Sequence, residues 1–310
     1  MGLNVTTLTD FVNENKMELI KKSILTGRTM DYVVIQPDIK SSAAINIIDS
    51  TIQAQAGGCS FNNLGTTELT QRNISVDAVR VNESICLDEL EAKWTQSLMN
   101  KGSYNEAIPF EEIYVQDKAD KIANMIESMV WQGDKATGTG NLAYADGLLK
   151  VIDAEAALGN VVNGNVNDET AITTANIIDI VDGMVDSVPE AIINADDLYL
   201  FISYSDFRTY ARALRNANLF HYTGEEGKDF IMTVPGTNVT MVATSGLNGT
   251  SRMVLSRKAN LYVGVDLLND YEDFDLFYSK DNQEVRFISK FKIGTQVSFP
   301  DFIVEYTNFV

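Results

Sequence analysis

The sequence predicts an α+β fold, and three patterns carry this prediction. Residues 72–81 alternate polar and apolar side chains with a period of two, which is typical of a half-buried strand. A long helical pattern begins at Pro109 and ends at Gly133. Between about 145 and 280, helical segments alternate with short apolar strands, which indicates an α/β layer.

The N-terminal part of the chain is predicted to be irregular at first and then to form a long β-excursion. Residues 1–40 are polar, with a weak helical pattern around 11–25. Residues 43–56 are rich in β-branched side chains and, together with 72–81, predict a long antiparallel excursion over about 45–82. Such a hairpin is not expected to be stable alone and requires a partner surface.

Two helices are predicted after this excursion. From Ser84 to Leu98 the apolar residues have helical spacing, and Gly102 is expected to end the first helix. The second begins at Pro109, a favoured first-turn residue, and its run to Gly133 corresponds to a rod on the order of 36 Å.

The C-terminal half is predicted to mix short helices and strands. The predicted helices cover about 174–193 and 204–216, and the predicted strands cover 197–203, 238–244, 252–256, 260–265 and alternating segments within 283–309.

Composition narrows the classes of protein. The 310 residues include 45% hydrophobic ones, with Lys+Arg 24 against Asp+Glu 43, which gives a net charge of −19. A specific DNA reader normally has the opposite charge. No apolar run is long enough for a membrane helix, and the first residues do not resemble a signal peptide. Two cysteines do not make a disulfide scaffold, so we expect a soluble protein made inside a cell.

Four features could carry chemistry, and each has a simpler explanation. His221 lacks the partners of a catalytic base, and residues 138–143 match G-x-G-x-x-A but follow a helix instead of a strand. The acidic residues between 266 and 281 lack the register of a calcium loop, and Cys59 is more simply an inert thiol than a crosslinking one. We therefore predict no enzyme activity, no catalytic residues, no cofactor and no metal site.

Five short segments, in their order along the chain, carry a resemblance to a known family. They are Trp131-Gln132-Gly133-Asp134, Gly147-Leu148-Leu149, the strand Asn-Leu-Tyr-Val-Gly-Val-Asp at 260–266, Lys-Ile-Gly-Thr-Gln-Val at 292–297 and Phe-Pro-Asp-Phe-Ile-Val at 299–304. In this order the sequence resembles the major capsid proteins of tailed bacteriophages of the Hong Kong 97 type.

The resemblance implies an organisation of the chain into five parts. They are an N-arm (1–42), an extended E-loop β-hairpin (43–83), a P domain with a long spine helix (84–144, helix about 109–133), an α/β A domain (145–282) and long antiparallel P-domain return strands (283–310).

The resemblance also implies a function without catalysis. Pentamers and hexamers of the chain would form an icosahedral head around phage double-stranded DNA, in a virion assembled in the host cytoplasm. The implied partners are further copies of the chain, a separate scaffolding protein, a portal, decoration or auxiliary capsid proteins, and DNA contacted non-specifically. No membrane is involved.

Two groups of residues are predicted to make contacts on this interpretation. The E-loop tip would contact a neighbouring subunit through Cys59, Phe61, Asn62 and Leu64. Four cations could contact DNA or a neighbour from the inner face, or could equally belong to a solvated arm helix: Lys16, Lys21, Lys22 and Arg28.

The sequence departs in two ways from the capsid protein after which the Hong Kong 97 type is named, and both departures affect how the shell would be held together and assembled. That capsid protein joins subunits through an E-loop lysine, but residues 54–81 contain no lysine, so we expect non-covalent contacts here. No long helical segment precedes the arm, which implies either a separate scaffolding protein or prior cleavage, and the initiator Met1 favours the separate scaffold. Two alternatives remain: an encapsulin-like nanocompartment shell, and an acidic α/β enzyme or carbohydrate-binding module.

Overall fold

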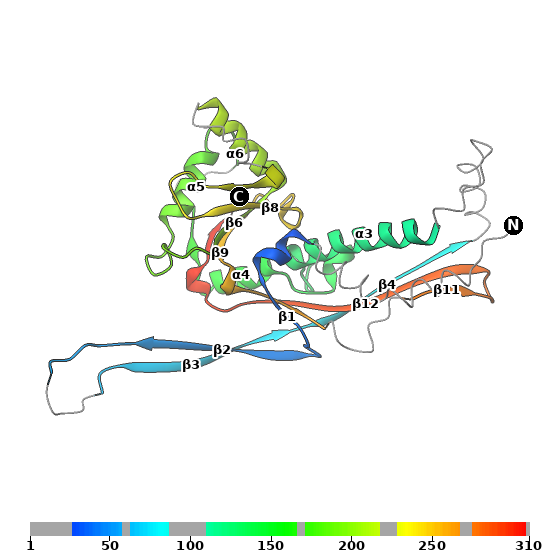
Figure 1. Cartoon of the computed structure of the whole chain (residues 1–310), viewed down its shortest axis with the longest axis horizontal. Helices are drawn as coiled ribbons and strands as arrows, with labels where there is room; N and C mark the ends of the chain where they lie inside the picture. The colour runs from blue at the N-terminus through cyan, green and yellow to red at the C-terminus, as the bar shows by residue number, and fades with distance from the viewer. Residues whose placement is uncertain are drawn as a thin grey trace.

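The computed structural model describes residues 27–57, 63–86, 110–165, 171–217, 228–266 and 275–307. These residues form a long sheet lined by one long helix, a second sheet under two short helices, and a hairpin that projects from the body (Figure 1). The α-helices are α3 (Phe110–Gln132), α4 (Leu148–Ala156), α5 (Ile177–Asp186) and α6 (Tyr204–Asn216). The short 3-10 helices are η1 (Arg28–Tyr32), η3 (Gly140–Ala143), η4 (Lys228–Phe230), η5 (Ser245–Leu247), η6 (Lys258–Asn260) and η7 (Pro300–Phe302).

The long sheet is organised around its longest strand, β12. This strand pairs with β4 along one edge and with β10 and β11 on the other, all antiparallel, while β1 pairs parallel with β10. Its side chains alternate between buried and half-buried, as a strand with one covered face requires. The strands are β1 (Val34–Gln36), β4 (Asp77–Cys86), β10 (Leu261–Val265), β11 (Asp275–Ser279) and β12 (Glu284–Val297).

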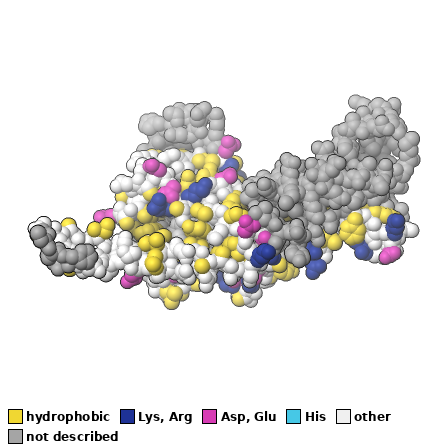
Figure 2. Space-filling view, turned by 60° about the horizontal axis from the view of Figure 1, so that its bottom comes forward, with side chains coloured by type: hydrophobic (Ala, Val, Ile, Leu, Met, Phe, Trp, Pro, Cys, Tyr) yellow, Lys and Arg dark blue, Asp and Glu magenta, His cyan; other side chains and the backbone are white. Residues whose placement is uncertain are grey.

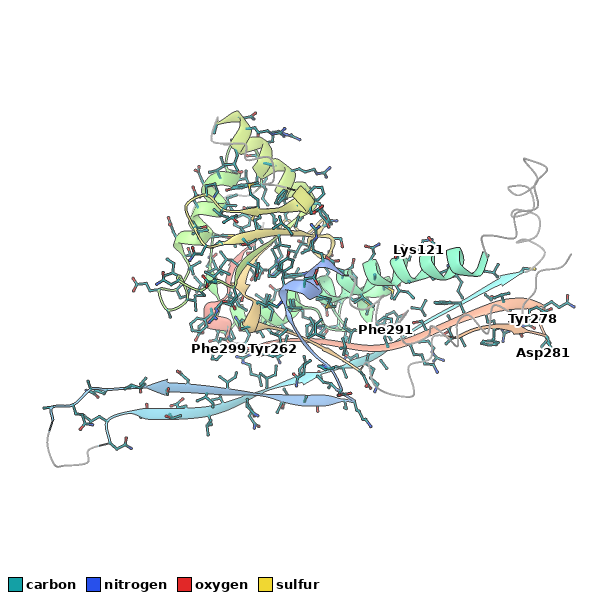
Figure 3. All side chains as sticks on the ribbon, in the orientation of Figure 1. Lys121, Tyr262, Tyr278, Asp281, Phe291 and Phe299 are labelled. Carbon is teal, nitrogen blue, oxygen red and sulfur yellow. The ribbon has the colours of Figure 1, made fainter. Side chains whose placement is uncertain are left out.

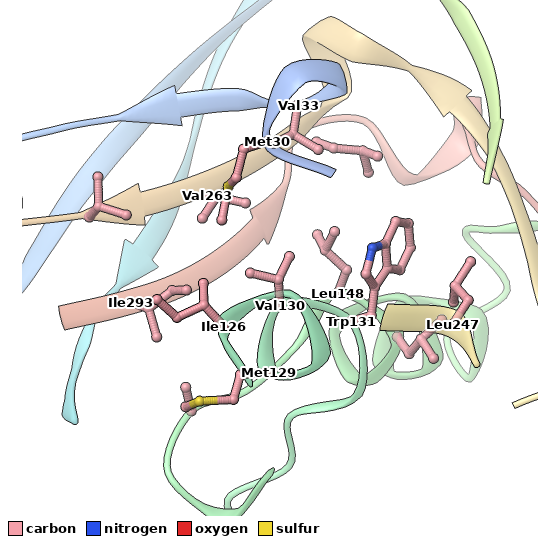
Figure 4. Close-up of a cluster of buried hydrophobic side chains, with 14 of the residues drawn as sticks. Met30, Val33, Ile126, Met129, Val130, Trp131, Leu148, Leu247, Val263 and Ile293 are labelled. Atoms are coloured by element: carbon pink, nitrogen blue, oxygen red, sulfur yellow. The ribbon is translucent and has the colours of Figure 1, made fainter. Parts of the chain in front are cut away.

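Helix α3 covers one face of this sheet. Its apolar residues recur every three or four positions, so they form a single stripe. Figure 4 shows Ile126, Val130 and Trp131 of this stripe among Val263 of β10 and Ile293 of β12. The long helix predicted from Pro109 to Gly133 is confirmed, because α3 runs from Phe110 to Gln132.

The second sheet has six strands in the order β5-β13-β9-β6-β8-β7. Only the β6–β8 and β5–β13 pairs are parallel, so the layer is mixed. One face packs against the core of α3 and α4, and the other packs under α5 and α6. The strands are β5 (Val162–Asn163), β6 (Leu198–Ser203), β7 (Ile231–Thr233), β8 (Thr240–Thr244), β9 (Met253–Arg257) and β13 (Val304–Tyr306).

The projecting hairpin pairs β2 (Ser42–Thr51) with β3 (Thr66–Ser75) as an isolated two-stranded sheet. Its root packs against the long sheet, where Tyr262 and Phe299 lie beside it (Figure 3). Figure 1 shows the rest of the hairpin extending away from the body. The hairpin's root is thus fixed, and its outer half lies beyond the cover of its own chain.

Two local predictions in this region are wrong. The strand predicted over 72–81 divides at Val76, because β3 pairs with β2 whereas β4 pairs with β12. The sequence predicts a helix that begins at Ser84, but residues 84–86 are the last residues of strand β4. There Ser84 pairs with Arg286 and Ile85 pairs with Val285 of β12. Pairing with a distant strand outweighs helical spacing here. Residues 87–109, including Gly102, lie outside the described residues.

The structure also assigns two strands to different sheets from those expected. Strand β10, expected in the α/β layer, pairs with β12 in the long sheet. Strand β13, expected among the return strands, pairs with β9 and β5 in the mixed sheet. The helix predicted over 174–193 is limited to α5. None of the described helices combines the length and apolar character needed to cross a membrane.

Candidate assembly surfaces

The outer half of the hairpin exposes apolar side chains that its own chain does not cover. Ile48 of β2 lies directly opposite Leu69 of β3, and their exposed fractions are 65% and 75%. Ile52 follows with 94% of its surface exposed. Figure 2 shows hydrophobic side chains along this arm next to the grey tip. Apolar residues concentrated on a projecting element indicate a contact surface for another molecule.

The opposite face of the same outer half carries an acidic pair. Asp49 and Glu68 lie directly opposite each other, both exposed, with no ion pair among the described residues. Like charges placed across a strand pair destabilise an isolated hairpin. Because side chains alternate along a strand, this pair lies on the same face as the buried root residues Ile45 and Ile47.

The root of the hairpin is held in a defined direction by contacts from β3. Arg72 donates to the Glu155 carboxylate of α4 at 2.6 Å, and Gln296 of β12 donates to the Asn73 carbonyl at 2.8 Å. Two glycines that face each other across β10 and β12, Gly264 and Gly294, let the root approach the sheet closely. The hairpin therefore leaves the body from a rigid base.

The predicted tip contacts are only partly within the described residues. Leu64 is described and is 51% exposed, whereas Cys59, Phe61 and Asn62 lie outside the described residues. Sequence reasoning overlooked Ile48, Ile52 and Leu69, because the excursion was not assigned a register. Pairing Ile48 with Leu69 was the signal that could have identified them.

Of the four predicted N-terminal cations, only Arg28 is among the described residues. Lys16, Lys21 and Lys22 lie outside the described residues, while Arg28 lies half-buried in η1. The backbone N–H of Arg28 donates to the buried carboxylate of Glu127 on α3 at 3.1 Å. Its Nη1 is buried with no hydrogen-bond partner among the described residues.

Glu127 connects three segments that are far apart in the sequence. Besides Arg28, it accepts hydrogen bonds from the Thr29 hydroxyl and from the Ser245 N–H of η5, each at 3.2 Å. The Trp131 indole donates to the Thr29 hydroxyl at 2.8 Å. A buried carboxylate with three donors is well satisfied, so this network fixes the start of the described chain and η5 on α3.

The other chemical candidates do not converge on a site. His221 lies outside the described residues. Gly138 follows α3 and donates to the Asp134 carbonyl at 2.8 Å, so no strand precedes this motif. Of the acidic run, Asp266 is buried and paired with Lys292 at 2.7 Å. Within the described residues, no cluster of three metal-ligating side chains occurs.

A charged cluster that is buried at Glu305 and partly exposed at Asp153 lies beside β13 of the mixed sheet. Arg252 lies directly before β9. Its guanidinium pairs with Glu305 of β13 and with Asp153 of α4, and one of its hydrogen bonds to Asp153 is 3.0 Å long. Beside it is a cavity of about 570 Å³. The described lining holds no histidine, cysteine or serine: it consists of Asp153, Ala156, Ala157, Val161, Val162, Asn163, Glu305 and Thr307.

Glu305 should make stability depend on pH. Burial raises the pKa of Glu305 to about 7, because Arg252, shared with Asp153, only partly offsets the cost of burying the charge. Between the ordinary value of 4.5 and this raised value, the folded chain keeps a proton that the unfolded chain has lost. Raising the pH through this window therefore lowers stability, and the loss is complete above about 7.

We expect Glu305→Gln to flatten this dependence, because the amide stays neutral at every pH. Urea titrations from pH 4.5 to 8 should show wild type losing on the order of 2–3 kcal/mol more than the variant. Asp153→Asn, which changes the more exposed carboxylate on the same arginine, is the control and should retain most of the dependence. Parallel profiles for wild type and Glu305→Gln would contradict the assignment.

Comparison with solved structures shows the fold of capsid proteins. A chain of the satellite phage P4 procapsid, in a structure that includes the size determination protein, has a TM-score of 0.57 at 13% identity. The match covers 96% of this chain and 99% of that chain. The capsid of an empty GTA particle gives 0.59 at 12% identity, with 92% and 89% covered.

An encapsulin shares the same architecture. The holo-SrpI encapsulin complex from Synechococcus elongatus gives a TM-score of 0.53 at 10% identity, covering 90% of this chain and 86% of that chain. No family model and no curated protein matches the sequence. The fold implied by the sequence resemblance, that of phage capsid proteins, is therefore confirmed from structure alone.

Proposed function

We propose that the chain is a structural shell subunit, the major capsid protein of a tailed bacteriophage, and that it has no catalytic role. The observation that carries this proposal is the β2–β3 hairpin. Its outer half bears the exposed Ile48–Leu69 pair on one face and Asp49 and Glu68 on the other. An element that is rigid at its root and uncovered beyond it is suited to lie across a neighbouring subunit.

The charge pattern supports a second copy as that neighbour. The hairpin root lies on the face of the long sheet that includes Gly294 of β12. The same face continues along β12 and β4, where Lys290 and Arg80 lie directly opposite each other. Asp49 and Glu68 lie on the face of the hairpin that packs, at its root, against this face of the sheet. A hairpin that continues onto the next copy would therefore place these acids over cations.

The proposed organisation follows the resemblance. Residues 1–42 act as the N-arm, the projecting hairpin acts as the E-loop with Leu64 near its tip, and α3 acts as the spine helix. The mixed sheet with α5 and α6 forms the A domain near the centre of pentamers and hexamers. Contacts are non-covalent, because residues 54–81 contain no lysine.

The partners follow from the same proposal. The shell encloses double-stranded DNA, which a surface with a net charge of −19 contacts non-specifically and weakly. A separate scaffolding protein, a portal and auxiliary capsid proteins complete the head, and Lys16, Lys21, Lys22 and Arg28 are the candidate inner-face contacts.

The encapsulin similarity favours a second candidate, a nanocompartment shell with protein cargo. The contents of native particles decide between the two. Nuclease-resistant DNA supports the phage head, whereas a co-purifying protein cargo without DNA supports the nanocompartment.

We expect the purified chain to form closed shells, or rings of five and six copies. Light scattering and negative-stain microscopy should be performed on the chain alone and after co-expression with its genomic neighbours. A monomer or dimer that never assembles under either condition would overturn both shell candidates and return attention to an enzyme or binding module.

A further inference from the structure

Helices α5 and α6 carry charge stripes of opposite sign. Helix α5 exposes Asp179, Asp182 and Asp186, at spacings of three and four residues that place them on one face, and it contains no lysine or arginine. We name these three residues the acidic stripe. Its apolar residues occupy the other face and lie in the core beneath.

Helix α6 has the reverse pattern. It exposes Arg208, Arg212 and Arg215, again on one face, and we name these three the basic stripe. Only Asp206 adds an acid, and that residue belongs to the helix start, where it bonds to the Ser203 hydroxyl at 2.7 Å. Both helices pack on the same face of the mixed sheet, so both stripes belong to the helical layer of the domain.

The two stripes do not neutralise each other within the chain. No ion pair among the described residues involves either stripe, and the arginine bonds at Arg208 and Arg215 go only to carbonyls of their own helix. Partial burial raises the pKa of Asp182, and the charges of Asp186 and Asp179 raise it further. Each helix thus concentrates like charges at spacings that are unfavourable without a partner.

We infer that the acidic stripe of α5 docks against the basic stripe of α6 in the adjacent copy of this chain. Each copy then turns its acidic stripe towards one neighbour and its basic stripe towards another, a head-to-tail contact of the kind that closes into rings. Nucleic acid fits this helical layer poorly, because the layer carries the acidic stripe as well as the cations. The inference rests on the proposed function and specifies a contact within its rings.

The test is a charge exchange. One variant carries Asp182→Arg and Asp186→Arg, a second carries Arg208→Glu and Arg212→Glu, and a third carries all four changes. Arginine and glutamate both favour helices, so circular dichroism and melting temperature should stay close to wild type. Each of the first two should lose at least tenfold in assembled particles by sedimentation and microscopy. The third should recover most of this loss, because the complementary contact is restored in reverse.

The matched control for the first variant is Asp196→Arg with Asp281→Arg, which makes the same change in net charge as that variant at exposed positions outside the stripes. It should assemble like wild type. Assembly of the first two variants at the wild-type level would overturn the inference, and so would failure of the third while it remains folded. A two-fold dimer as the end product would overturn the head-to-tail arrangement.

Failure of the proposed function gives a different result. In that case wild type forms no shell under any condition, and the stripes are tested on small oligomers by sedimentation equilibrium in low and high salt. Self-association that weakens in the two reversed variants and returns in the exchanged one supports the docking. The docking is overturned if the charge reversals leave self-association unchanged, or if the wild-type chain does not self-associate at all.

Discussion

A chain carrying Ile48→Asp should fold normally and form no shells, and Leu69→Asp should do the same. Both side chains are largely exposed in the single chain, so an acid there removes no buried contact. In the proposed shell the pair is covered by a neighbour, and a carboxylate would be transferred from water into an apolar contact. That transfer costs several kcal/mol for each copy and recurs at every contact of the shell.

The measurement is the fraction of chain in particles, followed by light scattering and microscopy, together with the melting temperature of the unassembled chain. Leu158→Asp is the matched control, because Leu158 is 73% exposed but lies on the body after α4. It should leave both quantities unchanged. Ile47→Asp tests the opposite case, since Ile47 is 7% exposed and its loss should lower stability.

Shells that form at wild-type yield from either Ile48→Asp or Leu69→Asp would contradict the role assigned to the hairpin. A large fall in melting temperature would show instead that these side chains support the fold. The two readouts therefore separate an assembly contact from a structural one.

The parts of the fold that the sequence predicted well are those fixed by local periodicity. Helix α3 and helix α6 follow from apolar spacing, and in α6 the Ser203 hydroxyl accepts from the Asp206 N–H at the predicted start. The alternation of β12 likewise identified a strand with one covered face. Each signal comes from neighbouring residues, so no knowledge of the tertiary fold was needed.

The parts that were missed depend on partners far away in the sequence. Ser84 and Ile85 have helical spacing with later residues, yet their backbone pairs with β12 some 200 residues away. Strands β10 and β13 are apolar and would suit either sheet, so their composition did not show to which sheet each belongs. Only the pairing register shows that Ile48 lies opposite Leu69 and Asp49 opposite Glu68.

We expect Gly294→Ala, at the hairpin root, to cause a large loss of stability. A Cβ at this position would lie 1.9 Å from the Ser75 carbonyl oxygen and 3.1 Å from the Val76 Cα. Both obstacles are backbone, so no side-chain rotation relieves the clash. The crossover from β3 to β4 must move, which strains the bond from the Val76 N–H to the Ser41 carbonyl, now 2.9 Å. A loss of about 2–4 kcal/mol is expected.

Urea denaturation measures this loss, and hydrogen exchange of the β2 and β3 amides shows whether the hairpin root has loosened. Gly57→Ala is the matched control, since a Cβ there meets no atom within 4 Å and should change stability by less than about 0.5 kcal/mol. Equal stabilities for the two variants would contradict the close packing of the root. Because the hairpin's direction depends on that root, Gly294→Ala should also reduce assembly at temperatures where the chain is still folded, which links the rigid base to the contact made by the outer half.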